Sequence, residues 1–260
     1  MEIKISLAQM DVRFGDPAAN FATVTRMTEE AKRRGSDLIL FPELWSTAYD
    51  LTRASRYASS LTSGLFADIS ALAQRTGIHI LGSTLSLFGE NKFGNTLTVF
   101  APDGTLLADY SKIHLFRLMD EHQYLTAGDK PVMVDLPFGR AGLAICYDLR
   151  FPELFRAHAL AGAEMAFLPS EWPQPRLMHW QTLIRARAIE NQMFIFACNR
   201  VGTDAQNVFF GHSMAVDPWG EILAEAGDGE EVISLSVDLS KVQDARKTIP
   251  ILQDWRPDVY

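Results

Sequence analysis

The chain has 260 residues, of which 47% are hydrophobic and 22% are charged. This composition is typical of a globular protein with a large core and excludes a disordered or collagen-like chain. The formal net charge is −8, which disfavours a general binder of nucleic acids or anionic membranes. The chain has only two cysteines and no apolar run long enough to span a bilayer. We therefore expect a cytoplasmic protein with neither a nucleic-acid nor a membrane partner.

The first half of the sequence alternates predicted strands and helices. Apolar residues at every second position from Ile3 to Leu7 predict an opening strand, and Gly15-Asp16-Pro17 predicts a turn and helix start. A helix is then expected over residues 20–34 and a buried strand over residues 37–41. A second helix over residues 65–75 leads to a strand at residues 78–81, and a hairpin is expected over residues 95–110.

The second half continues in the same way. Strands are expected at residues 143–146, 165–168 and 194–198, helices at residues 152–161 and 175–191, and a late hairpin over residues 211–226. Strands separated by helices, together with hairpins, indicate an α/β fold with mixed sheets. No linker-like stretch or internal repeat divides the chain, so we expect one domain over residues 1–260.

Three reactive or charged residues follow predicted strands. Glu43 follows the strand at residues 37–41, Lys112 follows the hairpin, and Cys146 follows an apolar run. Because ligand sites of open α/β sheets lie beyond the carboxyl ends of strands, the three side chains can converge. Each also has an ordinary interpretation, since free cysteines are often inert core residues and glutamates and lysines often lie at the surface. Their positions alone leave the function open.

The sequence around these residues resembles the nitrilase superfamily of carbon-nitrogen hydrolases. The resemblance rests on three segments in order, Leu40-Phe41-Pro42-Glu43, Ser111-Lys112-Ile113-His114 and Cys146-Tyr147-Asp148-Leu149-Arg150. Residues 114–122, Ala127-Gly128 and Cys198-Asn199-Arg200 look most like the omega-amidase branch. The resemblance implies a four-layer α-β-β-α sandwich with Cys146 on a tight turn between a strand and a helix.

It also implies a reaction. Cys146 would attack the carbon of an amide, and Glu43 would move the proton from the thiol to the departing ammonia. Lys112 would stabilise the oxyanion, with help from the backbone N–H of Tyr147. Glu121 matches the second glutamate of the family, although a shift of one residue would give this place to Asp120.

The same resemblance suggests a substrate pocket. An omega-amidase substrate is a small-molecule amide with a carboxylate at its remote end, for which a tyrosine, backbone N–H groups or an arginine are suitable partners. The candidates for this pocket are Tyr49, Phe116, Tyr147, Arg150 and Trp172. For the aromatic residues, core packing is an equally good interpretation.

The sequence has neither a glycine-rich phosphate loop, nor a metal-ligand cluster, nor a Gly-x-Ser-x-Gly elbow. We therefore expect a cysteine amidase without metal or other cofactor. A nitrilase and an N-carbamoyl amino acid hydrolase remain open because they share the same Glu-Lys-Cys centre. A thiol redox protein is disfavoured since no Cys-x-x-Cys occurs, and a non-enzymatic binding protein requires a decayed site. The resemblance also implies at least a homodimer, with residues 249–252, Trp255 and Tyr260 as candidates for its interface.

Overall fold

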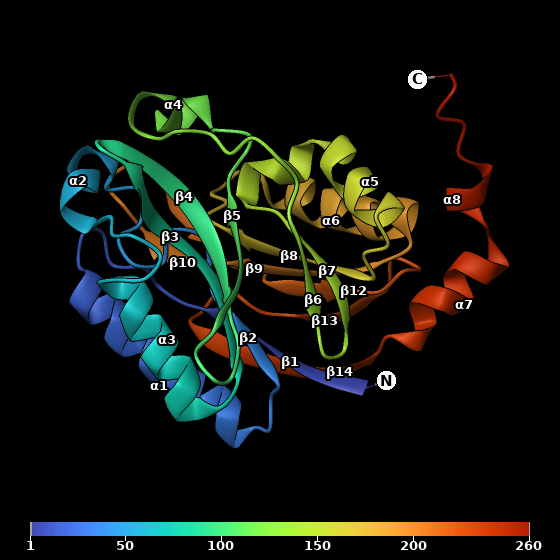
Figure 1. Cartoon of the computed structure of the whole chain (residues 1–260), viewed down its shortest axis with the longest axis horizontal. Helices are drawn as coiled ribbons and strands as arrows, with labels where there is room; N and C mark the ends of the chain where they lie inside the picture. The colour runs from blue at the N-terminus through green and yellow to red at the C-terminus, as the bar shows by residue number, and fades with distance from the viewer. Residues whose placement is uncertain (1, 260) are drawn as a thin grey trace.

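Two six-stranded β-sheets form the centre of the molecule in a computed structural model that describes residues 2–259 (Figure 1). The first sheet has the order β14 (Glu231–Asp238), β1 (Glu2–Gln9), β2 (Leu38–Leu40), β3 (His79–Gly89), β4 (Lys92–Phe100) and β5 (Leu106–Ser111). The second has the order β13 (Ile222–Glu225), β12 (Met214–Val216), β9 (Phe194–Asn199), β8 (Met165–Ser170), β7 (Gly139–Leu143) and β6 (Met133–Leu136). A separate ribbon pairs β10 (Val201–Thr203) with β11 (Val208–Phe210).

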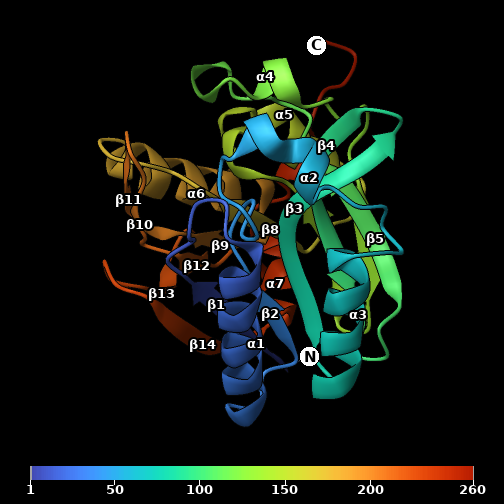
Figure 2. The same ribbon diagram turned by 90° about the vertical axis from the view of Figure 1, so that its left-hand side faces the viewer.

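Helices cover the outer face of each sheet. Figures 1 and 2 show α1 (Pro17–Arg33) and α3 (Leu65–Thr76) on the first sheet, and α5 (Pro152–Leu160) and α6 (Leu177–Asn191) on the second. The shorter helices are α2 (Ala54–Tyr57), α4 (Glu121–Tyr124), α7 (Ser240–Thr248) and α8 (Ile251–Asp254), and single 3₁₀ turns are η1 (Leu51–Arg53), η2 (Arg117–Met119) and η3 (Cys146–Arg150). The predicted α-β-β-α sandwich is confirmed.

The alternation of side chains along each strand separates two cores. In β2, Leu38 and Leu40 belong to the cluster between the sheets, whereas Ile39 belongs to the cluster beneath α1 and α3. Successive side chains of a strand point to opposite faces, and β2 is apolar on both because both faces are covered. At about 25 cal/mol per Å² of apolar surface, this burial is the main stabilising contribution to the fold.

Strand direction gathers the functional residues at one end of the sandwich. In the first sheet β2 and β3 are parallel, and β4 is antiparallel to both β3 and β5. β5 therefore runs in the same direction as β2, so Glu43 and Lys112 follow strands that end at the same edge. In the second sheet β7, β8 and β9 are parallel and their carboxyl ends lie together.

The structure departs from the expected elements at several places. The strand predicted at residues 78–81 extends to Gly89, because β4 pairs with it from Lys92 onward. The strand expected to end at Cys146 ends at Leu143, and Cys146 begins a 3₁₀ turn. Strands β6 and β14, which the sequence analysis does not predict, pair with β7 and β1. No helix within residues 2–259 has the length and apolar character needed to cross a membrane.

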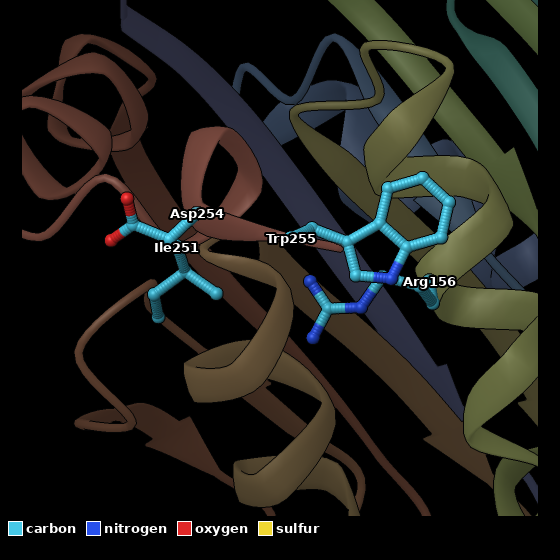
Figure 3. Close-up of a pocket in the computed structure, with 4 residues that line it drawn as sticks. All are labelled: Arg156, Ile251, Asp254 and Trp255. Atoms are coloured by element: carbon cyan, nitrogen blue, oxygen red, sulfur yellow. The ribbon is translucent and has the colours of Figure 1, made fainter. Parts of the chain in front are cut away.

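Helix α8 of the C-terminal segment lies against α6. Ile251, Asp254 and Trp255 line a hollow together with Arg156 of α5 (Figure 3). Ile249 and Trp255 are exposed. Tyr260 falls outside the described residues. The assignment of this segment to a homodimer interface stays a prediction.

Candidate active site

A buried lysine lies between two buried carboxylates. The Lys112 Nζ is 2.7 Å from Glu43 Oε1 and 2.7 Å from Glu121 Oε1, and all three side chains are fully buried. Burial alone would lower the pKa of Lys112, but the Glu121 and Glu43 carboxylates outweigh it and hold this pKa well above its ordinary value. Lys112 is therefore a fixed cation.

The loop between α4 and β6 fixes the backbone of Lys112. The Gly128 N–H donates to the Lys112 carbonyl at 2.9 Å. A Cβ at Gly128 would lie 2.1 Å from the Ser111 carbonyl oxygen, so only glycine permits this approach. This contact gives a structural reason for the Ala127-Gly128 pair of the sequence motif.

Glu43 is held by three donors. Besides Lys112, the Asn95 Nδ2 donates to Glu43 Oε1 at 2.8 Å, and the Glu171 backbone N–H donates to Glu43 Oε2 at 3.1 Å. Asn95 comes from β4 and Glu171 directly follows β8, so both sheets fix this carboxylate. A carboxylate restrained in this way is oriented before a substrate arrives.

The second acidic residue beside Lys112 is Glu121, whereas Asp120 is exposed and bonds to Gln123. Glu121 also accepts from the Tyr49 hydroxyl at 2.9 Å and from the Phe116 backbone N–H at 2.5 Å. Burial raises the pKa of Glu121, with Lys112 acting in the opposite direction. Burial likewise raises the pKa of Tyr49 well above its usual range, so Tyr49 is a neutral donor.

Cys146 stands on a constrained turn. Its φ is +48°, a left-handed conformation that costs a non-glycine residue of order 1 kcal/mol. Asp148 stabilises the turn by accepting from the Ile145 N–H at 2.8 Å, the Tyr110 hydroxyl at 2.7 Å and the His114 Nδ1 at 2.7 Å. The turn places the Cys146 thiol next to Glu43.

The thiol is neutral at rest. Burial raises the pKa of Cys146 well above its ordinary value, and the Glu43 carboxylate raises it further, while Lys112 lowers it. A thiol must lose its proton to act as a nucleophile. Here Glu43 is the neighbouring group that can accept this proton.

Four of the predicted pocket residues line one cavity with Cys146. Phe116, Tyr147, Arg150 and Trp172 form its wall together with Glu171, Pro173 and Arg176. The Arg150 guanidinium lies 4.8 Å from the centre of the Trp172 ring. The Arg176 guanidinium lies 5.9 Å from the centre of the Phe116 ring. Tyr49, the fifth predicted pocket residue, does not line this cavity and instead contacts Lys112 and Glu121.

The sequence analysis missed the residues that support the centre. Two of them, Asn95 and Glu171, donate hydrogen bonds to Glu43. Asp148 holds the turn that carries Cys146, and Arg176 lines the cavity. Glu171 follows β8 just as Glu43 follows β2, so the same rule of polar residues after buried strands could have found it. Among residues 2–259, no cluster of three or more His, Cys, Asp or Glu side chains has the arrangement of a metal site.

Asp148→Asn should lower both stability and activity. The NH₂ group of the asparagine would face N–H and O–H groups that now donate to the carboxylate, so that donors would meet without an acceptor. A buried unsatisfied donor costs about 1 to 3 kcal/mol. Urea unfolding should show this loss, and kcat should fall because the turn that carries Cys146 loosens. Unchanged stability would contradict the role given to Asp148, and Asp135→Asn, on an exposed ion pair with Arg140, is the matched control.

Comparison with known proteins connects this geometry to a family. A model of the carbon-nitrogen hydrolase family matches residues 4–247. The chain is 38% identical to the 2-oxoglutaramate amidase of Bacillus subtilis (strain 168), with all of both chains covered. It is 32% identical to the mouse (Mus musculus) omega-amidase NIT2, covering 99% of this chain and 96% of the relative.

A solved structure adds to this comparison. It is an amidase mutant from Nesterenkonia sp. AN1 that shows covalent addition of the acetamide moiety of fluoroacetamide at its active-site cysteine. The two structures have a TM-score of 0.89 and 25% sequence identity, with 99% of this chain and 95% of that chain covered. The family match over most of the chain agrees with the two full-length relatives and with the shared fold. This chain belongs to the carbon-nitrogen hydrolase family and is a hydrolase of the amidase type.

Proposed function

We propose that the chain is a cysteine-dependent amidase that hydrolyses the terminal amide of a small dicarboxylic acid monoamide similar to 2-oxoglutaramate. The observation that carries the proposal is the cavity, in which Cys146 lies with Arg150 and Arg176. Next to Cys146 stands the buried Glu43–Lys112 pair. This arrangement offers a nucleophile with its base and oxyanion partner, and cations for a remote carboxylate.

The first half of the reaction forms a thioester. Glu43 accepts the proton of Cys146 as Sγ bonds to the amide carbon, and the carbonyl oxygen becomes an oxyanion held by Lys112 and the Tyr147 N–H. The C–N bond then breaks, and the nitrogen leaves as ammonia with the proton that Glu43 returns. Because burial keeps the thiol neutral at rest, proton transfer accompanies the attack.

The second half releases the acid. A water molecule gives a proton to Glu43 and bonds to the thioester carbon, which again produces an oxyanion beside Lys112. The C–S bond breaks, and the sulfur recovers its proton from Glu43. Glu121 and Tyr49 hold Lys112 in place during both steps through bonds of 2.7 Å and 3.5 Å.

Arg150 is the proposed partner of the remote carboxylate. Its guanidinium stacks on Trp172 and is partly buried in the wall of the cavity, which restricts its rotamers before the substrate binds. In a protein of net charge −8, a local cation is needed to attract an anionic substrate. A planar guanidinium can also donate two parallel hydrogen bonds to a carboxylate.

The relatives support this substrate class. The Bacillus subtilis relative is named for hydrolysis of 2-oxoglutaramate, and the Nesterenkonia amidase forms a covalent adduct at its cysteine. The same Glu-Lys-Cys centre also serves a nitrilase or an N-carbamoyl amino acid hydrolase, so substrate preference separates the three. We also propose that the enzyme acts in the cytoplasm.

A substrate panel tests the proposal. Ammonia release should be faster from 2-oxoglutaramate and succinamate than from simple nitriles or N-carbamoyl amino acids. A nitrile lacks the carbonyl oxygen for which the oxyanion site is arranged. Faster turnover of a nitrile or a carbamoyl compound would assign the chain to another activity of the family.

Arg150→Met should raise KM for succinamate and leave hydrolysis of butyramide, which lacks the carboxylate, much less affected. Loss of one charge-assisted contact costs about 1.5 to 3 kcal/mol, or roughly 10- to 150-fold in kcat/KM. Steady-state kinetics on the two amides measures this difference. Arg140→Met, on an exposed pair with Asp135, is the control. An equal loss on both amides would show that Arg150 acts on the reaction centre instead.

A further inference from the structure

A buried carboxyl beside the site is unused by the proposed mechanism. Glu171 directly follows β8, is 1% exposed, and donates its backbone N–H to Glu43 Oε2. Its side chain turns to Arg200, which directly follows β9, and Glu171 Oε2 lies 3.4 Å from Arg200 Nη1. Both side chains of this pair are fully buried.

Arg200 connects the ends of strands from both sheets. Its Nη2 donates to the Val12 carbonyl at 2.6 Å, just beyond β1, and its Nε donates to the Val201 carbonyl at 3.1 Å. The guanidinium also lies 4.2 Å from the centre of the Phe209 ring and 3.5 Å from Asp11. These contacts leave Arg200 one position, so it can serve as a fixed anchor for Glu171.

The neighbouring residue anchors the same segment. Asn199 Oδ1 accepts from the Trp172 N–H at 2.7 Å, and Asn199 Nδ2 donates to the carbonyl of Trp172 at 3.2 Å and of Gly211 at 2.9 Å. The Arg200 N–H further donates to the Ser170 carbonyl at 3.2 Å. The last residue of β9 and the residue after it therefore hold the last residue of β8 and the two residues after it.

We propose that Glu171 and Arg200 are positioning residues: their buried contact, together with Asn199, fixes the segment 170–172 so that the Glu171 N–H orients the carboxylate of Glu43. The same segment carries Trp172, on which Arg150 stacks. The pair thus fixes the orientation of the proton acceptor Glu43 and the position of Trp172 in the wall of the substrate cavity. The effect on turnover rests on the proposed amidase function, whereas the effect on the reactivity of Cys146 does not.

Glu171 acts as a neutral acid near pH 7. Burial raises its pKa to about 8, because the lowering effect of Arg200 is smaller, and the nearby carboxylates of Glu43 and Asp204 raise it as well. Glu171 Oε1 has no hydrogen-bond partner among the described residues, which also disfavours a charge on this group. The anchor therefore depends on hydrogen bonding and shape, and a glutamine should be able to replace Glu171.

Glu171→Ala and Glu171→Gln separate positioning from catalysis. Glu171→Ala should lower kcat by about 10- to 100-fold with a much smaller change in KM, because Glu43 loses its fixed orientation. Glu171→Gln should keep most of kcat at pH 7. Leu72→Ala, at a buried core position of α3, is the control for a general loss of stability and should keep its kcat.

Alkylation of Cys146 by iodoacetamide without substrate gives a readout independent of amidase activity. The alkylation rate should fall in Glu171→Ala and in Arg200→Lys, whose ammonium cannot make all the contacts of the guanidinium. As the pH rises through about 8, Glu171 becomes an anion close to Glu43 and Cys146, and this added negative charge disfavours the thiolate of Cys146. The alkylation rate of Glu171→Gln relative to that of wild type should therefore increase over this range.

Several results would overturn the proposal. Wild-type kcat and alkylation in a folded Glu171→Ala would show that the segment needs no anchor. A Glu171→Gln variant as inactive as Cys146→Ala would make Glu171 a catalytic residue. If Glu171→Ala does not fold, Arg200→Lys and Glu171→Gln still decide the question. If alkylation slows in Glu171→Ala and Arg200→Lys as predicted, but the enzyme hydrolyses no monoamide, only the amidase function is refuted.

The stability of Glu171→Gln should also depend on pH in a defined direction. Below about pH 4.5, the ordinary pKa of a glutamate, Glu171 is protonated in both the folded and the unfolded chain. Between this pH and about 8, only the unfolded chain loses the proton, so ionisation favours unfolding of the wild type. Urea unfolding at pH 5 and pH 8 should show Glu171→Gln gaining stability relative to wild type as the pH rises. A difference independent of pH would contradict a neutral Glu171.

Discussion

Cys146→Ala should abolish amide hydrolysis while the protein still folds. Removing the nucleophile of a cysteine or serine hydrolase lowers kcat by roughly 10⁴-fold or more, because no other group forms the covalent intermediate. The lost sulfur is one small buried group on a turn that Asp148 continues to hold. Ammonia release and circular dichroism of the same preparation measure the two properties.

Cys198→Ala is the matched control. Cys198 is also fully buried, and burial raises the pKa of its thiol, but its sulfur accepts a hydrogen bond from the Ser213 hydroxyl. This variant should keep most of the activity. Equal losses in the two variants, or turnover that persists in Cys146→Ala, would contradict the roles assigned to the cysteines.

Lys112→Met should lower kcat by on the order of 100- to 1,000-fold and change KM far less. In the proposed mechanism, the methionine removes the cation that stabilises the oxyanion, which exists only after the Cys146 sulfur has attacked. Initial rates of ammonia release at saturating substrate give kcat directly. A defect confined to KM would instead make Lys112 a substrate-binding residue.

The charge balance around Lys112 requires a second variant. Lys112→Met leaves Glu43 and Glu121 buried without their shared cation, and breaking such a pair costs about 3 to 5 kcal/mol. Adding Glu121→Gln should restore part of the stability without restoring kcat. Lys112→Arg should also rescue poorly, because its planar guanidinium does not fit the point between two carboxylates.

The central residues of the site could be predicted from the sequence because they follow strands. Glu43 follows the apolar strand predicted at residues 37–41, Lys112 follows the second strand of the predicted hairpin, and strands of one direction end at one edge of a sheet. The family resemblance added the pairing of these residues with Cys146 and the choice of an acid beside Lys112. The structure places Glu121 and not Asp120 there, a distinction of one residue that sequence reasoning left open.

The contacts of the supporting residues could not be predicted because their partners are remote in sequence. Glu171 contacts Glu43 across 128 residues, and Arg200 contacts Val12 across 188 residues. No local pattern encodes such contacts. Strand β14 was missed for a similar reason: it adds to the edge of the first sheet beside β1, more than 220 residues away, and its residues are only partly buried.

Trapping of the acyl-enzyme tests the central claim most directly. Enzyme mixed with succinamate and hydroxylamine should yield the hydroxamate, and rapid acid quenching followed by mass spectrometry should show the succinyl group on the peptide that contains Cys146. The Cys146→Ala variant should give neither product, and Cys198→Ala should give both. Hydrolysis of succinamate without a hydroxamate, or a succinyl group on another residue, would contradict a thioester at Cys146.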